Sequence, residues 1–164
     1  MLRSLGAGLP LELHSYGLYD LGPEPPLREA LVAAERLEID ISQHRARPLE
    51  GENLAASDLV LGFERIHVAT AVVDAGARRE RTFTLPELVE LLEDTEIPAA
   101  ADPVERARLG VSAAHERRTV IGPDEVFPEV ADPWSQPNAV YVETARAVDV
   151  LCRRLARRLF GKAA

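Results

Sequence analysis

The stretch Asp58-Leu59-Val60-Leu61-Gly62-Phe63 decides the fold class that we expect for this chain. Its compact apolar run is typical of a β-strand that is covered on both faces, as the strands of a parallel sheet are. The residues that follow, 64–73, are expected to form a helix. A covered strand followed by a helix predicts a sheet with helices above and below it.

Strand-like and helix-like segments alternate along the rest of the chain. Apolar and polar residues alternate over 11–14, whereas the apolar residues of 27–37 recur at helical spacing. The expected strands are residues 11–14, 58–63 and 81–84; the expected helices are 27–37, 64–73, 87–92, 103–118 and a longest one starting at Asn138, with shorter helical turns at 1–5 and 50–56. This alternation predicts one α/β domain over residues 1–164, with a small, mainly parallel sheet.

Two of the expected helices begin with capping signals. Thr84-Leu85-Pro86-Glu87 matches a capping box, in which the threonine hydroxyl and the glutamate carboxylate each accept a backbone N–H of the other residue. Asp102-Pro103 places a capping side chain directly before a proline that suits the first helical position. Both signals predict where a helix starts.

The composition narrows the classes of partner and compartment. The chain has 164 residues with 19 Lys plus Arg against 27 Asp plus Glu, a net charge of −8, so no broad basic face for nucleic acid or an anionic membrane is expected. No apolar run approaches the roughly 20 residues of a membrane span, and no signal-like segment follows Met1. We therefore expect a cytoplasmic protein that binds neither nucleic acid nor membrane.

The single cysteine and the scattered histidines argue against redox and metal chemistry. One cysteine excludes an intramolecular disulfide and a multi-cysteine zinc cluster. Cys152 lies between Leu151 and Arg153 on the apolar stripe of the last helix, so we expect a buried, unreactive thiol. The four histidines show no i, i+4 pairing. We expect no metal and no cofactor.

The turn Val130-Ala131-Asp132-Pro133-Trp134 is the candidate functional element of the chain. We interpret it as a turn that holds a carboxylic acid over a pocket. From this turn alone, an Asp-Pro turn that caps the helix beginning near Asn138 is the favoured interpretation, and the family resemblance given below reverses that preference.

Five segments, taken in order, resemble the low-molecular-weight protein tyrosine phosphatases of the high-GC bacterial type. They cover nearly the whole chain: Leu9-Pro10-Leu11-Glu12-Leu13-His14-Ser15-Tyr16-Gly17; the Ser-x-His-Arg-x-Arg-like Ile41-Ser42-Gln43-His44-Arg45-Ala46-Arg47; Ser57-Asp58-Leu59-Val60-Leu61 with Glu64-Arg65; Arg81-Thr82-Phe83-Thr84-Leu85; and Val130-Ala131-Asp132-Pro133-Trp134 with the helix after it. The resemblance implies a phosphotyrosine phosphatase I-like fold, a three-layer α/β sandwich. It also implies hydrolysis of phosphotyrosine in a protein or of a small aryl phosphate.

The resemblance assigns roles to three residues. Asp132 stands at the position of the general acid, which protonates the tyrosine oxygen as that oxygen leaves. Trp134 and Tyr16 stand at positions that imply contact with the substrate.

The other half of the family's mechanism has no counterpart in this sequence. That mechanism uses a Cys-x5-Arg-Ser loop, whose backbone N–H groups and arginine hold the phosphate while the thiolate attacks phosphorus. The resemblance places Met1 within the family's first helix, just beyond this loop. We therefore expect the chain to lack the first central strand, the nucleophile and the phosphate-binding arginine, and to be inactive as written.

Two explanations for this difference stay open: a shortened reading of a longer gene, or a degenerate member that lost its loop. The corresponding functions are a phosphatase completed by the missing loop and a non-catalytic pseudophosphatase that acts in binding or oligomerisation. Arsenate reduction would need thiols that the chain does not contain. The missing central strand would leave open edges on residues 11–14 and 58–63, which predicts rearrangement or a homodimer that closes the sheet.

Overall fold

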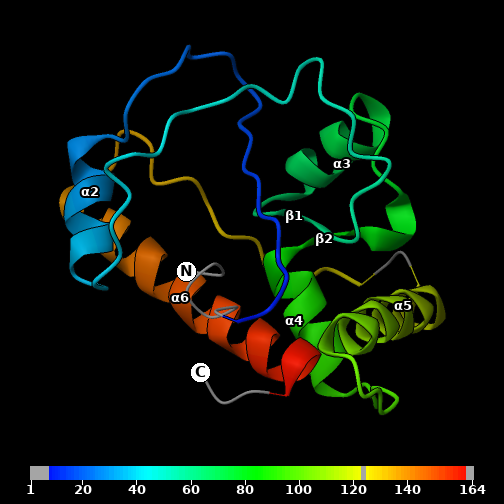
Figure 1. Ribbon diagram of the computed structural model, residues 1–164. Helices are drawn as coiled ribbons and strands as arrows, with labels where there is room; N and C mark the ends of the chain where they lie inside the picture. Colours follow the sequence, from blue (N-terminus) through cyan, green and yellow to red (C-terminus); the bar gives the residue numbers. More distant parts are fainter. Residues whose placement is uncertain (1–7, 123–124, 162–164) are drawn as a thin grey trace.

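Two short parallel strands form the centre of the fold. The computed structural model describes residues 8–122 and 125–161 (Figure 1). Strand β1 (Val60–Gly62) pairs in parallel with β2 (Thr82–Thr84), and Leu61 lies opposite Phe83. The strands expected at 58–63 and 81–84 are therefore confirmed.

The five longer helices expected from the sequence are also confirmed, and each starts within two residues of the expected position. They are α2 (Arg28–Glu35), α3 (Arg65–Val73), α4 (Leu85–Glu93), α5 (Pro103–Ile121) and α6 (Asn138–Phe160), with a 3-10 helix, η1 (Arg79–Arg81), before β2. The helical turn expected at 1–5 lies outside the described residues. The alternation of strands and helices makes this an α/β fold with a small parallel sheet.

The two faces of the sheet pack against different helices. Leu59, Leu61 and Phe83 belong to the main core with buried residues of α4, α5 and α6. Val60, which points to the opposite face, packs with Ala71 of α3 in a smaller cluster. In Figure 1, α3 accordingly lies on one side of the strands and α4, α5 and α6 on the other.

Strand β1 is less buried than the sequence predicts. All three residues of β2 are buried, whereas those of β1 are half-buried and the following Phe63 is 44% exposed. Within the described residues, β2 is the only strand that pairs with β1, so the other edge of β1 is open. The expectation of helices on both faces is confirmed, but the burial of β1 stays partial, because one neighbouring strand and a small alanine-rich cluster do not enclose it.

Two local predictions are wrong. Residues 11–14 form no strand. Close to them, an isolated parallel bridge joins Gly17 to Pro48, and Gly17 N–H donates to Arg47 O over 2.8 Å. Residues 50–56 form turns in place of helical turns, because Gly51 takes φ +81° and the Asn53 side chain accepts the Ala55 N–H. In both segments tertiary pairing and side-chain bonds override local periodicity.

The capping box at α4 is confirmed and is part of a larger buried network. Thr84 N–H donates to Glu87 Oε2 over 3.0 Å, and Glu87 N–H donates to Thr84 Oγ1 over 3.2 Å. Arg118 of α5 reaches Glu87 Oε1 at 3.3 Å and also donates to the carbonyl oxygens of Thr82 and Arg79. The network therefore ties β2, α4 and α5 together. The cap of α5 is confirmed as well, since Asp102 accepts the Val104 N–H.

Candidate functional site

The loop that carries Asp132 is attached to the carboxyl end of β1. Val130 N–H donates to Phe63 O over 3.0 Å, directly beyond the last residue of the strand. Glu129 Oε1 accepts the Arg65 N–H over 2.7 Å and forms an ion pair with Arg65 Nε at 2.9 Å. In parallel α/β sheets, ligands bind beyond the carboxyl ends of the strands. The fold thus holds Asp132 near the edge where such a sheet binds its ligand.

Within the loop, Asp132 closes a tight turn. Trp134 N–H donates to Asp132 Oδ1 over 3.0 Å, and Gln136 N–H donates to Pro133 O over 2.9 Å. The N-cap residue of α6 is Pro137, so Asp132 does not cap that helix. Asp132 is exposed, and its Oδ2 has no hydrogen-bond partner among the described residues. One carboxylate oxygen is held by the turn, while the other is free for a ligand.

A hollow of about 480 Å³ lies beside this turn. Three of its lining residues, Glu129, Asp132 and Glu143, carry carboxylates, and none is a lysine, arginine or histidine. The full lining consists of Glu129, Val130, Ala131, Asp132, Gln136, Val140, Glu143, Thr144 and Ala147. Arg65 pairs with Glu129, but Asp132 and Glu143 have no ion pair among the described residues, so like-charge repulsion disfavours a phosphate dianion in this hollow.

Trp134 lies next to the acid but outside the hollow. Its side chain is exposed, with 57% of the residue accessible, and its backbone N–H is the group that contacts Asp132. Trp134 is also the one tryptophan of the chain. Its fluorescence therefore reports on the Asp132 turn alone.

Tyr16 belongs to a different part of the structure. It packs against the alanine-rich cluster around Ala71, and the Arg47 guanidinium lies 4.9 Å from the centre of its ring. Burial and a hydrogen bond to Glu52 raise the pKa of the Tyr16 hydroxyl. Among the described residues, no hydrogen bond or ring contact joins Tyr16 to Asp132 or Trp134. The structure therefore brings Asp132 and Trp134 together and places Tyr16 in the cluster on the α3 side of the sheet.

Cys152 is a core residue. It is 3% exposed and packs in the main core, and burial raises the pKa of its thiol to about 11. A thiol with this pKa remains protonated near neutral pH and is a poor nucleophile. The expected burial of Cys152 is confirmed.

The residues that hold the acid loop, Phe63, Arg65 and Glu129, were not expected from the sequence to belong to the site. Phe63 could have been found from the rule that sites lie beyond the carboxyl ends of parallel strands, since it directly follows β1. The pair between Arg65 and Glu129 joins residues 64 positions apart, and sequence spacing carries no signal for it. In the two described ranges, 8–122 and 125–161, no group of three or more His, Cys, Asp or Glu is placed to hold a metal ion.

A parallel α/β sheet with an acid-bearing loop at its carboxyl end is the architecture of several hydrolase and phosphate-binding folds. Comparison with solved structures identifies which of these folds the chain has. It matches the crystal structure of the low molecular weight protein tyrosine phosphatase from T. tengcongensis with a TM-score of 0.64 and 24% identity, over 94% of this chain and 83% of that chain.

The chain therefore has the fold of a low-molecular-weight protein tyrosine phosphatase. No protein-family model and no curated protein matches it by sequence. For the part of the chain that the structure describes, no helix combines the length and apolar character needed to cross a membrane.

Proposed function

We propose that this protein is a phosphatase-like domain of the high-GC bacterial type; once a nucleophile and a phosphate-binding group are supplied, its reaction is the hydrolysis of phosphotyrosine in a protein or of a small aryl phosphate in the cytoplasm. The observation that supports this function is the attachment of the Asp132 loop to the carboxyl end of β1, within a phosphatase fold. Asp132 is the general acid. Trp134 and Tyr16 are proposed to contact the substrate, Trp134 from the same turn.

The chemistry follows from the free oxygen of Asp132. As a nucleophile forms its bond to phosphorus, the bond between phosphorus and the phenolic oxygen breaks, and Asp132 gives its proton to that oxygen. The carboxylate then accepts a proton from the water that releases phosphate. Among the described residues, the one thiol is buried in the core and the hollow has no cation. We therefore propose that the 164-residue chain by itself does not complete the reaction.

An assay with p-nitrophenyl phosphate tests this function. The 164-residue chain is expected to show no more turnover than its Asp132→Asn variant, and orthovanadate is expected to leave the fluorescence of Trp134 unchanged. No turnover is expected because protonating a leaving group accelerates the reaction only when a nucleophile attacks phosphorus. Circular dichroism on both proteins checks that they are folded.

Turnover that depends on Asp132 would contradict the proposal of an inactive chain. If the chain turns over substrate and Asp132→Asn reduces kcat by about 100-fold or more while Asp20→Asn does not, the chain has its own nucleophile. The assignment of Asp132 as acid then stands, and the proposal of an inactive chain is wrong.

The open edge of β1 favours a second candidate function, a non-catalytic pseudophosphatase that binds a partner or oligomerises. The backbone N–H and C=O groups of β1 on that edge have no strand partner among the described residues. Such an edge readily pairs with another chain. A homodimer that pairs two β1 edges would give a continuous sheet. The three-layer sandwich expected from the sequence remains a prediction for this completed sheet.

Amide hydrogen exchange at two protein concentrations tests the edge pairing. If β1 pairs between chains, protection of the amides of β1 increases with concentration, because ladder hydrogen bonds slow exchange. Protection that stays constant while the mass of the particle doubles would place the dimer contact elsewhere. Protection that stays constant in a monomer would remove this candidate.

A further inference from the structure

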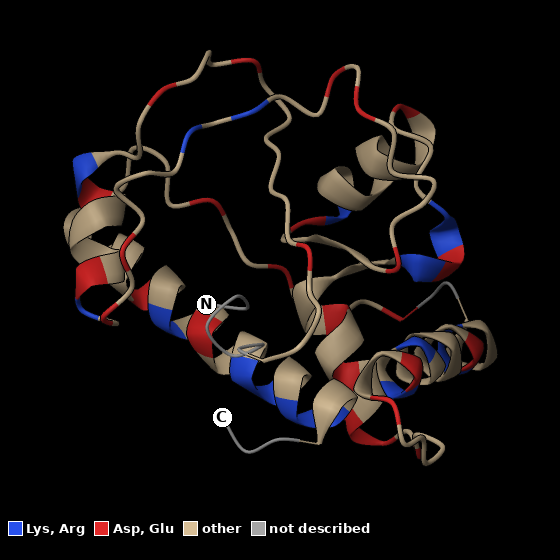
Figure 2. Cartoon of the chain, viewed as in Figure 1, with Lys and Arg blue, Asp and Glu red and all other residues tan. Residues whose placement is uncertain are grey.

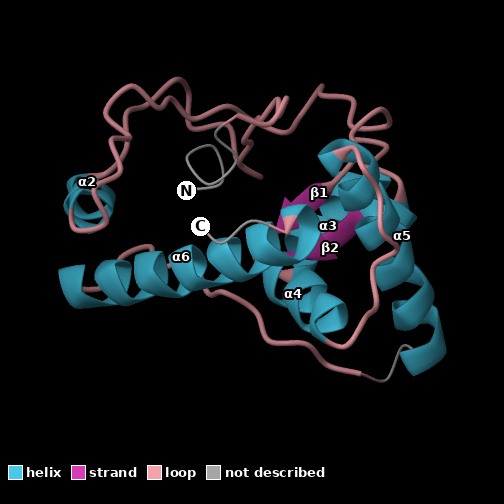
Figure 3. Cartoon of the chain, turned by 60° about the horizontal axis from the view of Figure 1, so that its bottom comes forward, coloured by secondary structure: helices cyan, strands magenta, loops and turns pink. Residues whose placement is uncertain are grey.

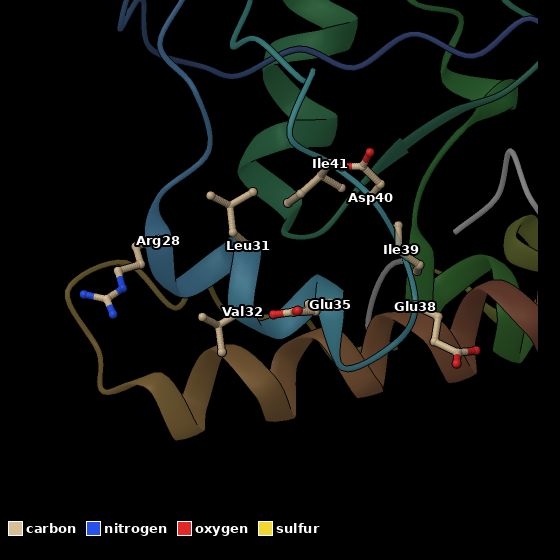
Figure 4. A pocket seen from close by; sticks show the side chains of 8 residues that line it. All are labelled: Arg28, Leu31, Val32, Glu35, Glu38, Ile39, Asp40 and Ile41. Atoms are coloured by element: carbon tan, nitrogen blue, oxygen red, sulfur yellow. The ribbon is translucent and has the colours of Figure 1, made fainter.

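A second hollow, of about 460 Å³, lies between α2 and the segment that follows it (Figure 4). Figure 4 shows Leu31 on the helix and Ile41 on the segment directed into the space between them. We call this hollow the α2 groove; it is lined by Arg28, Leu31, Val32, Glu35, Glu38, Ile39, Asp40 and Ile41. Its volume lies in the range in which protein grooves hold a ligand or a partner side chain.

Among the described helices, α6 is the one that supports α2. Ala33 packs against Tyr141 and Val142 of α6, and in Figure 3 α2 lies beside the first half of α6 and apart from α3 and α5. On the other side, Leu27 and Leu31 remain 42% and 36% exposed. A helix of eight residues gains little stability from its own hydrogen bonds. Covering the exposed apolar side would therefore stabilise it.

The charges around the α2 groove favour a basic occupant. Its lining contains three carboxylates, those of Glu35, Glu38 and Asp40, and one cation, Arg28. Asp40 accepts the Ser42 N–H over 2.8 Å, and this bond lowers the pKa of its carboxyl, so Asp40 is ionised at neutral pH. An occupant that complements this groove carries aliphatic side chains for its floor and positive charges for its rim.

The exposed side of α6 has this composition. Arg146, Val150, Arg153 and Arg157 follow one another at helical spacing on its solvent-facing side, and Val150 is 53% exposed. We call these four residues the α6 stripe. Figure 2 shows basic residues along α6. In the described part of the chain, Arg146 and Arg157 form no ion pair, and Arg153 uses only its Nε to bind Asp149.

The stripe cannot reach the groove of its own molecule. Within one chain, α2 contacts the side of α6 that carries Tyr141 and Val142, while the α6 stripe faces solvent. The stripe spans about 17 Å and α2 about 12 Å, at 1.5 Å per residue, so the two helices match in length closely enough to pack side by side.

We propose that the α2 groove binds the α6 stripe of a second copy of this chain. Val150 lies on the aliphatic floor, and the arginines face Glu35 and Glu38. The contact joins two different surfaces, so it closes into a dimer if both copies engage at once and otherwise extends to larger assemblies. It does not involve the edge of β1.

Charge reversal on each surface tests the contact by sedimentation velocity over a range of concentrations. The groove variant carries Glu35→Arg with Glu38→Arg, and the stripe variant carries Arg146→Glu with Arg157→Glu. The unaltered chain is expected to self-associate at low salt and to dissociate as salt screens the charges. Each variant is expected to raise the dissociation constant by about tenfold or more, and an equimolar mixture of the two variants is expected to restore association.

The groove variant separates a specific contact from an effect of net charge. Its substitutions reduce the net charge of −8 in magnitude, so weaker general repulsion alone would strengthen association. The control Glu105→Arg with Glu116→Arg makes the same charge change on exposed positions of α5 and is expected not to weaken association.

The proposal is overturned by a chain that is monomeric at low salt, by a control that weakens association as much as the groove variant does, or by a mixture of variants that stays dissociated. Association that persists in both variants and at high salt also overturns it. In that case pairing through the edge of β1 still stands, because main-chain hydrogen bonds respond little to charge reversal on α2 and α6. Circular dichroism on every variant shows whether it is folded.

Discussion

Replacing Arg118 with alanine is expected to lower the free energy of unfolding by about 3 to 5 kcal/mol. The Arg118 and Glu87 side chains are 10% and 9% exposed, and their charged groups lie 3.3 Å apart. Arg118 also donates to the carbonyl oxygens of Thr82 and Arg79, over 2.9 and 2.7 Å. Without the guanidinium, a buried carboxylate and these carbonyl oxygens lose their partner. Urea denaturation followed by circular dichroism measures the loss.

The neighbouring arginine provides a matched control. Arg117 pairs with Asp94 at 3.2 Å, but their side chains are 37% and 75% exposed. Arg117→Ala is expected to cost less than about 1 kcal/mol, because exposed ion pairs contribute little. Equal losses for the two alanine variants would show that the buried network does not stabilise the fold. Arg118→Met, which keeps the volume and removes the charge, separates packing from pairing.

Replacing Phe83 with alanine is expected to cost about 3 to 5 kcal/mol. Phe83 is fully buried in the main core, and the Arg118 guanidinium lies 4.1 Å from the centre of its ring. The substitution leaves a cavity at the point where β2 meets α4, α5 and α6, and it removes the ring that stacks with Arg118. The midpoint of urea denaturation is the measurement.

Phe63 is the control for this second prediction. Phe63 directly follows β1, whereas Phe83 lies within β2. Because Phe63 is 44% exposed, Phe63→Ala is expected to lower the free energy of unfolding by less than about 1 kcal/mol. A larger loss for Phe63→Ala than for Phe83→Ala would mean that the fold is centred on β1. The double variant Phe83→Ala with Arg118→Ala should cost less than the two single losses added together, because the residues are in contact.

The site combines the proposed general acid, Asp132, with an unfavourable environment for phosphate. The loop of Asp132 is attached to β1 by the bond from Val130 to Phe63 and by the ion pair of Glu129 with Arg65. The hollow beside it carries three carboxylates and no cation. If Asp132 acts as the acid, as we propose, this hollow does not by itself supply groups that bind the phosphate anion.

Local sequence was sufficient for elements whose signals are short-range. Thr84 and Glu87 predict the start of α4 because both bonds of a capping box join residues three apart. The apolar stripe through Leu155 and Leu159 predicts α6 because one helix face supplies most of that contact with the core. Asp132 and Trp134 were expected together because they share one turn.

Predictions failed where the outcome depended on a partner distant in sequence. Residues 11–14 alternate like a strand, but a strand forms only with a neighbour, and the chain pairs instead at Gly17 and Pro48. The burial of β1 depended on how many strands lie beside it. Tyr16 lies apart from Asp132 because its ring packs among alanines on the α3 side of the sheet.

The sequence by itself determined the order of helices and strands, the capping of α4 and α5, the burial of Cys152 and the acid turn, since each depends on residues close together along the chain. Only the tertiary structure decided that residues 11–14 form no strand, that Arg118 neutralises Glu87, and that the lining of the hollow beside Asp132 contains carboxylates without a cation. Those properties depend on which distant segments pack together, and packing is set by the whole core at once.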